Sequence, residues 1–336
     1  MSFAQLPVFV PDFSGVLPAE VAALIPDLND SLTAAFAAYK PVALASGIVK
    51  EAPIDGSNRL ILIEADRPTL FRLWDADRLI QPIAIRSQDI TPDLYEMTIG
   101  IPRTTFQDSA RIENVWNGVF ANIGMQMAAF PDYLAAAALA LAVSTVGYDG
   151  VNILSTSHPV NPENAGAGEW SNYFTSTPLT TENLASAYAS LMQIPGRDGL
   201  PFSNRAPGSV KLIVPSQLAF AAEQATGEMI GRIVYGDTSG TVGASPESNV
   251  RLSRLGIEVV VLQTLEDQDA WFLADTTTGA YPTLVMGMRE PFYITPLISP
   301  TAQNVFWKNQ YIWGVNGRVN VGYSLPQNLV GATSSA

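Results

Sequence analysis

Few residues of this 336-residue chain could do chemistry, and the first of them is its single histidine, His158. A chain with one histidine and no cysteine lacks the nitrogen and sulfur ligands that a zinc site needs. A Ser-His-Asp arrangement would need a serine on a sharp strand-to-helix turn, and the chain contains no G-x-S-x-G sequence. We therefore predict that His158 makes hydrogen bonds in a loop, and a hydrolase that uses His158 is the weaker alternative.

Three other stretches invite a chemical interpretation, and none of them supports one. The glycine-rich residues 166–169 follow no predicted strand and lack the spacing of a dinucleotide-binding loop, and the chain has no P-loop sequence. Residues 237–240 resemble an aspartic-protease turn with one residue too many, and no second copy is present. Glu266, Asp267 and Asp269 are best explained as a solvated turn, with a weak cation site as the alternative. We therefore predict no catalytic residue, no cofactor and no metal.

Composition indicates apolar surface that must be buried somewhere. Hydrophobic residues make up 47% of the chain and charged residues 15%, below the roughly 25% of charged residues in ordinary soluble domains. The longest apolar candidate, residues 133–146, is shorter than the roughly 20 residues of a membrane-spanning helix. We therefore expect no membrane segment and a large surface covered by other copies of the chain. A large, well-buried monomer is the alternative.

The net charge limits the kind of partner. It is −13 at pH 7, and the only lysines are Lys40, Lys50, Lys211 and Lys308. A protein that grips nucleic acid carries a basic stripe, so this chain should enclose or repel a nucleic acid without binding it tightly or sequence-specifically. The first ten residues lack the basic start and apolar core of a signal peptide, and a chain without cysteine suits assembly in the cytoplasm.

Residues 111–150 contain the longest helical pattern and should organise the fold. Their apolar residues recur at spacings of three and four, which places them on one face of a helix. Such a helix is a rod of roughly 50 Å, bent at Pro131 and ended at Gly147. The residues predicted to pack along this spine are Trp116, Phe120, Ile123, Met127, Phe130, Leu134, Ala137 and Leu141.

The chain before the long helix should depend on neighbours for its structure. Residues 1–50 are predicted as an extended arm with short helical pieces within 18–38, because they lack the periodicity of a self-sufficient core. A flexible tail is the alternative. Residues 60–63 are a short strand candidate.

Two further strands are predicted to form a hairpin just before the long helix. They comprise residues 81–87 and 94–102, and the turn formers of residues 88–93 join them. A two-stranded hairpin is only marginally stable alone. We therefore expect a neighbouring subunit to cover it.

The part after the long helix has a mixed pattern, so the predicted fold class is α+β. Residues 148–176, which include His158, are predicted as a loop. The elements predicted next are helices at 180–193 and 216–225 and short buried strands at 210–214, 257–262 and 271–274. Residues 282–326 are β-rich and include the aromatic-rich stretch 304–313, and the alternation of residues 318–324 predicts a strand; this region should pack on the long helix. Residues 329–336 are predicted as a short tail.

A set of short motifs in a fixed order resembles a known family. The motifs are Trp74-Asp75-Ala76-Asp77-Arg78, Ile99-Gly100-Ile101-Pro102-Arg103, Pro131-Asp132, Tyr148-Asp149-Gly150, Ser157-His158-Pro159-Val160, Asn304-Val305-Phe306, Tyr311, Gly314-Val315 and Asn320-Val321-Gly322-Tyr323. With the order of arm, hairpin, long helix, α+β region and return strands, they resemble the Hong Kong 97-type phage major capsid proteins, and more closely the Mu-like major head subunit family. The resemblance covers roughly residues 60–325. Ser157 departs from the family pattern, which has an acidic residue before the His-Pro pair.

The resemblance implies a structural protein rather than an enzyme. Such a protein self-assembles as pentamers and hexamers into an icosahedral shell around the double-stranded DNA of a tailed phage or prophage, so it would be part of the virion. It would consist of an N-terminal arm (residues 1–55), an extended β-hairpin loop that lies over an adjacent subunit (56–110), a peripheral domain with the spine helix (111–150 and 281–336) and an axial domain (151–280).

The same resemblance suggests contacts and partners. Some members of the fold form a covalent cross-link through a lysine on the extended loop, but residues 51–110 contain no lysine, so we predict no cross-link. The predicted contacts with neighbouring subunits are Arg72, Trp74, Arg78, Arg86 and Arg103, with the arginines as donors to acidic residues. A separate scaffold protein is expected, because the chain starts at its arm without a long charged helical segment before it, and a portal is a further expected partner. A decoration protein is a further candidate partner.

Two alternatives remain open at this point. An encapsulin-type compartment shares the fold and would hold protein cargo instead of a genome. A hydrolase would lose its activity in the variant His158→Ala, whereas we expect a shell protein to tolerate that change.

Overall fold

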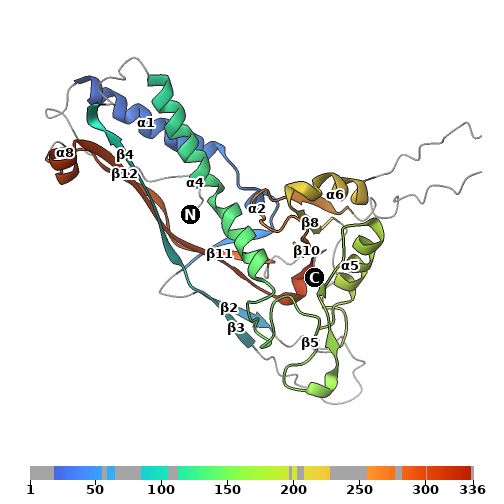
Figure 1. The fold of residues 1–336 in the computed structure, drawn as a ribbon. Helices are drawn as coiled ribbons and strands as arrows, with labels where there is room; N and C mark the ends of the chain where they lie inside the picture. Colours follow the sequence, from blue (N-terminus) through green and yellow to red (C-terminus); the bar gives the residue numbers. More distant parts are fainter. Residues whose placement is uncertain are drawn as a thin grey trace, which may run out of the picture.

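The computed structural model shows an elongated subunit in which a long helix runs beside a long β-hairpin (Figure 1). It describes residues 19–54, 59–64, 85–104, 113–196, 199–202, 208–227, 256–276, 282–299 and 301–333. Within these ranges, no helix is both long and apolar enough to span a membrane. The two larger sheets belong to the elongated body and to a smaller body at one end of it.

The sheet of the elongated body has the strand order β1-β11-β12-β4. Its centre is an antiparallel pair of 14-residue strands, β11 (Leu284–Leu297) and β12 (Gln310–Tyr323), joined through the short helix α8 (Gln303–Lys308). β4 (Asp93–Pro102) pairs antiparallel with β12, and β1 (Val49–Pro53) pairs parallel with β11. Every second residue of β12 is buried, which agrees with the alternation predicted from the sequence.

The predicted long helix is α4 (Glu113–Leu141), and it packs on β12. Phe120 and Met127 are buried in the core, and four other predicted spine residues pack partly buried against it: Trp116, Ile123, Phe130 and Leu134. The Phe120 ring meets Trp313 of β12 edge-on, with 5.0 Å between ring centroids.

The helix ends earlier than predicted. Its last residue is Leu141, whereas Gly147 was the predicted terminus. Beyond Leu141, backbone carbonyl groups that would accept hydrogen bonds within a continued helix accept them from amides of the following loop instead. The amide of Leu154 donates to the carbonyl of Ala142 at 2.9 Å, and the amide of Ile153 donates to that of Thr145 at 2.8 Å.

The predicted packing of Leu141 and Ala137 is also wrong, since both are exposed and Leu141 is 57% exposed. A strict seven-residue repeat drifts by about 20° per heptad on a straight helix. By the end of α4 the predicted stripe has therefore rotated to the edge of the contact, where Ala137 and Leu141 line an open cleft between the helix and strands β4 and β12. Leu139 and Ala142 take the core positions instead.

Where the sequence predicted short helical pieces within residues 18–38 of the arm, the structure has a single 20-residue helix. α1 (Ala19–Ala38) packs along α4, and its residues Leu28, Leu32 and Phe36, spaced by four, are buried in the common core. The backbones approach closely at Gly124 of α4, where a Cβ atom would lie 2.4 Å from the carbonyl oxygen of Leu32. The sequence predicted that this segment cannot form a core of its own, and the structure agrees, because α4 supplies the surface on which α1 packs.

The predicted hairpin of residues 81–102 is wrong, although both of its strands exist. β3 (Ile85–Ile90) pairs antiparallel with β2 (Arg59–Glu64), whereas β4 pairs with β12. Only Thr91 and Pro92 separate β3 from β4. The proline interrupts one extended course of the chain, as prolines do at strand ends, and does not reverse it. We call the β2–β3 pair the ribbon; the residues between its strands lie outside the described ranges.

The smaller body contains a sheet with the strand order β7-β13-β10-β8-β9. Three predicted strands are present in it: β8 (Val210–Val214), β9 (Glu258–Val261) and β10 (Trp271–Asp275). The predicted helices α5 (Thr181–Gln193) and α6 (Ala219–Thr226) pack with this sheet around a second apolar core.

The predicted C-terminal tail is wrong, because residues 329–332 are a buried strand of this second sheet. β13 (Leu329–Ala332) lies between β10 and the short β7 (Tyr173–Phe174), and all four of its residues are buried. A stretch this short is ordered by the strands on both sides of it, which its own sequence does not reveal. The end of the described chain therefore joins the smaller body to the elongated one.

Candidate functional site

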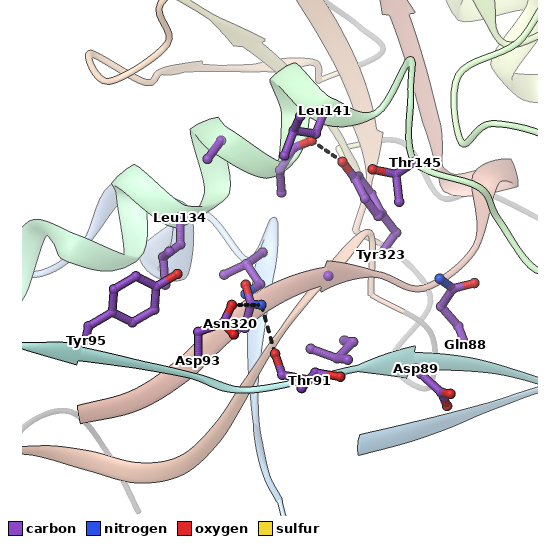
Figure 2. Close-up of a pocket in the computed structure, with 15 residues that line it drawn as sticks. Gln88, Asp89, Thr91, Asp93, Tyr95, Leu134, Leu141, Thr145, Asn320 and Tyr323 are labelled. Carbon is purple, nitrogen blue, oxygen red and sulfur yellow. Dashed lines mark hydrogen bonds between the residues drawn. The ribbon is translucent and has the colours of Figure 1, made fainter. Parts of the chain in front are cut away.

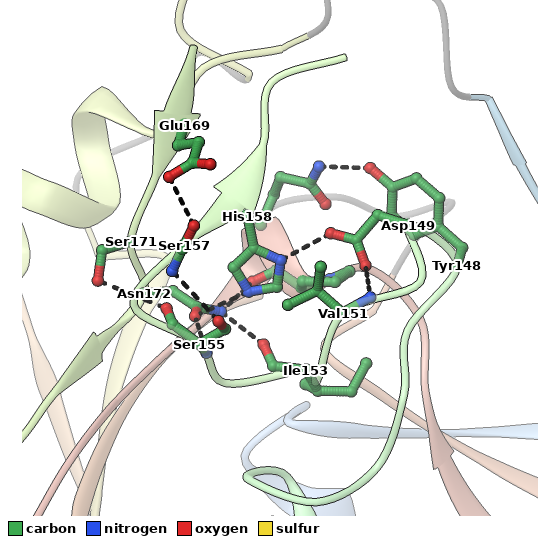
Figure 3. A network of polar contacts seen from close by, with 12 residues as sticks. Tyr148, Asp149, Val151, Ile153, Ser155, Ser157, His158, Glu169, Ser171 and Asn172 are labelled. Carbon is green, nitrogen blue, oxygen red and sulfur yellow. Dashed lines mark hydrogen bonds and ion pairs between the residues drawn. The ribbon is translucent and has the colours of Figure 1, made fainter. Parts of the chain in front are cut away.

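A buried polar network holds the loop that carries His158 (Figure 3). His158 is 0% exposed and begins the two-residue strand β5 (His158–Pro159), which pairs with β6 (Glu169–Trp170). Its ring stacks on Trp170, with 4.3 Å between ring centroids. Its Nδ1 atom lies 2.6 Å from Oδ2 of Asp149, and its Nε2 atom lies 3.1 Å from Oδ1 of Asn172.

Asn172 is the centre of this network and is fully buried. Its Oδ1 atom accepts a hydrogen bond from the amide of Ser155 at 2.9 Å. Its Nδ2 atom lies within donating distance of three carbonyl oxygens, at 2.7, 3.2 and 3.1 Å, which belong to Ile153, Pro326 and Leu329. Because these contacts fix the amide oxygen as an acceptor, Nε2 of His158 is the donor between them. The network thus ties the loop after α4 to the start of β13.

The geometry favours anchoring over hydrolysis. The Nε2 atom of His158 faces an amide oxygen, which is not a nucleophile, and the hydroxyl of Ser157 donates to Glu169 at 2.6 Å. The predicted hydrogen-bonding role of His158 in a loop is therefore confirmed. The expectation that a shell protein tolerates His158→Ala is revised, since removal of this buried ring would take away the partner of Oδ2 of Asp149 and one of the two donors to Oδ1 of Asn172.

A second buried carboxylate fastens the N-terminal segment to α4. Asp132 is 4% exposed, and its Oδ1 and Oδ2 atoms accept from the amides of Ala43 at 2.8 Å and Val42 at 3.0 Å. These amides open the short helix α2 (Val42–Ala45), so Asp132 caps that helix from outside. The hydroxyl of Tyr39 also donates to Oδ2 at 3.4 Å. Burial raises the pKa of Asp132 above its ordinary value, although these three hydrogen bonds lower it.

We predict that Asp132→Ala lowers the free energy of unfolding by about 2 kcal/mol, because two buried amides lose their acceptor. A carboxyl whose pKa is raised in the folded state contributes most below its unfolded pKa, and part of that contribution is lost as the pH rises through the folded value. The loss in Asp132→Ala should therefore increase as the pH falls from about 7 toward about 4. Denaturant unfolding of dissociated subunits at several pH values measures this.

The matched control is Asp267→Ala, because Asp267 lies in an exposed turn where its Oδ1 atom accepts only the amide of Asp269, at 3.0 Å. It should change the free energy of unfolding by less than about 0.5 kcal/mol. An Asp132→Ala loss no larger than that of the control, or one that is greatest at neutral pH, would contradict the prediction.

A cleft of about 410 Å³ lies between the C-terminal part of α4 and the strands β4 and β12 (Figure 2). Leu134 and Leu141 contribute to its apolar wall, and Asp93, Asn320 and Tyr323 lie around it. Asp93 accepts a hydrogen bond from Asn320, and the hydroxyl of Tyr323 donates one to the carbonyl of Ala138. Burial raises the pKa of the Tyr323 hydroxyl above its usual range. The cleft therefore offers a surface for packing rather than reactive groups.

The five predicted contact residues are only partly placed by the structure. Arg72, Trp74 and Arg78 lie outside the described residues, and Arg86 lies on β3, where only its backbone is described. Arg103 directly follows β4, and its amide donates to the carbonyl of Asn309 at 2.8 Å. Their role in subunit contacts stays a prediction.

The acidic turn agrees with its prediction. Glu266, Asp267 and Asp269 are all exposed. Among the residues that the structure describes, no group of three or more His, Asp or Glu side chains could hold a metal ion. Residues 237–240, the other stretch considered for chemistry, lie outside the described ranges.

Two aromatic side chains of α8 are exposed, although the sequence predicted that residues 304–313 pack on the long helix. Phe306 is 71% exposed and Trp307 is 78% exposed, and their rings meet edge-on at 5.0 Å. Tyr311 and Trp313 of the same stretch are each 1% exposed. The alternation of buried residues that includes these two belongs to β12 and begins only after α8. This helix lies at the end of the β11–β12 hairpin that is far from the smaller body (Figure 1). Exposed aromatic rings of this size are typical of partner surfaces.

The two polar sites are held together by three residues whose roles were not predicted: Asp132, Asp149 and Asn172. Asp132 carried a signal, because a carboxylate in a long apolar helix needs a buried partner. Asp149 stood in one of the short motifs. Asn172 carried none, since an asparagine in a polar loop is ordinary.

Comparison with known proteins gives consistent matches. A family described as Mu-like prophage major head subunit gpT matches residues 65–177 and 257–335, which is more than half of the chain. A stretch of 101 residues, 30% of this chain, is 32% identical to the major capsid protein of Escherichia phage Mu and spans 32% of the length of that protein.

Solved structures with a similar fold include chains of phage capsids. A chain of the bacteriophage JBD30 procapsid gives a TM-score of 0.55 at 20% identity, covering 95% of this chain and 76% of that one. A chain of the bacteriophage PhiM1 mature capsid gives a TM-score of 0.51 at 12% identity, covering 98% and 91% respectively. At these identities the likeness shows the fold alone, and it confirms the predicted α+β capsid fold.

Proposed function

Because the chain belongs to the family of Mu-like prophage major head subunits, we propose that copies of it assemble into an icosahedral shell that encloses the double-stranded DNA of a tailed phage or prophage. The family match over more than half of the chain is the observation that carries this proposal. The capsid-type fold supports it, and so does the exposed aromatic pair Phe306 and Trp307 on a chain with only 15% charged residues.

Within this shell we assign the parts of the chain as the sequence suggested. Residues 1–55 are the N-terminal arm, residues 56–110 the extended loop over an adjacent subunit, residues 111–150 and 281–336 the peripheral domain, and residues 151–280 the axial domain. Two structural facts adjust these limits: β1 belongs to the sheet of the peripheral domain, and β13 to the sheet of the axial domain. The ribbon is then the base of the extended loop.

The proposed relation to DNA is enclosure without tight or sequence-specific binding, which a net charge of −13 supports. Pentamers and hexamers of this chain, a separate scaffold protein, a portal and a decoration protein are its predicted partners. Subunits should hold together without a covalent cross-link. Arg72, Trp74, Arg78, Arg86 and Arg103 are the proposed contacts.

The test is negative-stain electron microscopy with sedimentation, on the chain expressed alone and with its neighbouring genes. Closed shells or capsomer-sized rings are expected, with single subunits on a denaturing gel. DNA inside the particles supports a phage head, whereas a protein cargo would indicate an encapsulin-type compartment. A uniform monomer under both conditions would overturn the proposal.

A paired variant links this test to the structure. Phe306→Ser with Trp307→Ser should leave the melting temperature of the dissociated subunit nearly unchanged, because both side chains are more than two-thirds exposed. It should reduce the yield of shells. Unchanged yield would show that this aromatic pair is not a subunit contact.

A further inference from the structure

The ribbon enters and leaves the elongated body at two isoleucines that rest on the same glycine. Ile54, the residue directly after β1, and Ile90, the last residue of β3, are 6% and 3% exposed. The amide of Ile54 donates to the carbonyl of Met288 at 3.0 Å. A Cβ atom on Gly287 of β11 would lie 2.6 Å from Cδ1 of Ile54 and 3.4 Å from Cγ2 of Ile90.

A second glycine on the neighbouring strand completes the seat of Ile90. A Cβ atom on Gly322 of β12 would lie 2.6 Å from Cγ1 and 2.8 Å from Cδ1 of Ile90. Carbon atoms in van der Waals contact are about 3.5 to 4.0 Å apart, so no other residue type fits at either glycine while the isoleucines keep these positions. Gly287 pairs with Asn320, and Gly322 pairs with Val285, so the two glycines lie close together on adjacent strands.

Asn320 fixes the chain just after Ile90. Its Nδ2 atom donates to the carbonyl of Thr91 at 2.8 Å and to Oδ2 of Asp93 at 2.9 Å, as Figure 2 shows. These bonds hold the two residues on either side of Pro92. We call these two hydrogen bonds the Asn320 clamp. They hold the backbone between β3 and β4 in place, so this segment is not a flexible hinge.

We propose that Gly287 and Gly322 form a socket that seats Ile54 and Ile90 and, with the Asn320 clamp, sets the direction in which the ribbon leaves the subunit. In this role the glycines are positioning residues, since they act through the two isoleucines. The consequence for assembly rests on the proposed function: a ribbon that points in another direction reaches a different place on the neighbouring subunit. The direction itself is a property of the single subunit and is testable without any shell.

The experiment measures a distance by double electron–electron resonance in dissociated subunits. The chain has no cysteine, so Ser87→Cys on the ribbon and Gln126→Cys on α4, both at exposed positions, give two unique sites for spin labels. The otherwise unchanged chain should give one narrow distance distribution. Gly287→Ala should shift or broaden it, because both isoleucines lose their seat, and Gly322→Ala should do so through Ile90 alone.

Two further variants make the result specific. Gly314→Ala is the matched control on β12, because the nearest atom to its Cβ position is 3.7 Å away, and it should leave the distribution unchanged. Ile90→Ala, with both glycines kept, should shift or broaden it as the glycine variants do, since it removes the side chain that both glycines seat. If Gly287→Ala does not fold, Asn320→Ala carries the test through loss of the clamp.

If Gly287→Ala or Gly322→Ala folds and gives the same distance distribution as Gly314→Ala, the proposal is overturned. An unchanged distribution in Asn320→Ala also overturns it when that variant carries the test. Electron microscopy of the same variants separates the two proposals. Failure of the unchanged chain to form shells would overturn the proposed function and leave the distance result standing. If the unchanged chain forms shells, socket variants should give open or differently sized particles.

Discussion

Asn172→Asp should lower the free energy of unfolding of the subunit by about 3 to 5 kcal/mol, the range seen when a buried polar pair is left with an uncompensated charge. The substitution keeps the shape of the side chain and replaces only Nδ2 by an oxygen. That oxygen would face the carbonyl oxygens of Ile153, Pro326 and Leu329, where a donor now stands. The penalty is a large fraction of the roughly 5 to 15 kcal/mol that holds a typical domain folded.

Asn164→Asp is the control for the same chemical change. Asn164 is exposed, and its Oδ1 atom accepts from the amide of Gly166 at 3.1 Å, a role that a carboxylate oxygen fills equally well. Denaturant unfolding of dissociated subunits, followed by tryptophan fluorescence, should separate the two variants clearly. Equal stability of the two would mean that the network does not anchor the C-terminal strand.

The elements that could be predicted from the sequence are those whose pattern is local. α5 has its N-cap at Thr180, whose hydroxyl accepts from the amide of Asn183 at 3.2 Å, and its apolar residues repeat at helical spacing. β8 and β10 are five-residue strands that are apolar except for Lys211 and Asp275, and a proline follows β8. Each of these signals lies within the element itself, so tertiary contacts had little to change.

The errors concern pairing, which depends on residues far apart in the chain. Residues 88–93 contain turn formers, and a hairpin was the nearest local solution. The structure instead extends β4 along β12, whose partner residues lie more than 200 positions later, for example Val319 opposite Asp93. A strand partner at that separation leaves no trace in the sequence of either strand. The same reason applies to β13, which is ordered by β10 and β7.

The candidate site was only half predictable for a related reason. His158 was visible as the single histidine, and its hydrogen-bonding role was expected from the absence of a partner nucleophile motif. Its actual partners, Asp149 and Asn172, are 9 and 14 residues away and reach it only because β5 and β6 fold the loop back. Ordinary polar residues become site residues here through loop geometry, which composition and spacing do not encode.

Gly124→Leu should release α1 from α4 and lower the free energy of unfolding by roughly 5 kcal/mol. A Cβ atom added at this position would lie 2.4 Å from the carbonyl oxygen of Leu32 and 3.2 Å from the amide nitrogen of Phe36. Backbone atoms cannot move aside as a flexible side chain does, so the whole helix must shift. Separation exposes the buried side chains of Leu28, Leu32 and Phe36, each worth about 1.5 to 3 kcal/mol when buried.

Gly118→Leu is the matched control, because it places the same side chain on the same helix where nothing lies within 4 Å of the Cβ position. It should stabilise α4 slightly, by up to about 1 kcal/mol, since glycine is a poor helix former. Hydrogen exchange locates the effect: in Gly124→Leu the amides of α1 should exchange quickly while those of β11 and β12 stay protected. Equal protection of α1 in both variants would mean that the close approach at Gly124 does not hold the N-terminal helix. Selective loss of protection in α1 would instead show that the segment predicted as an arm owes its order to one glycine on the long helix.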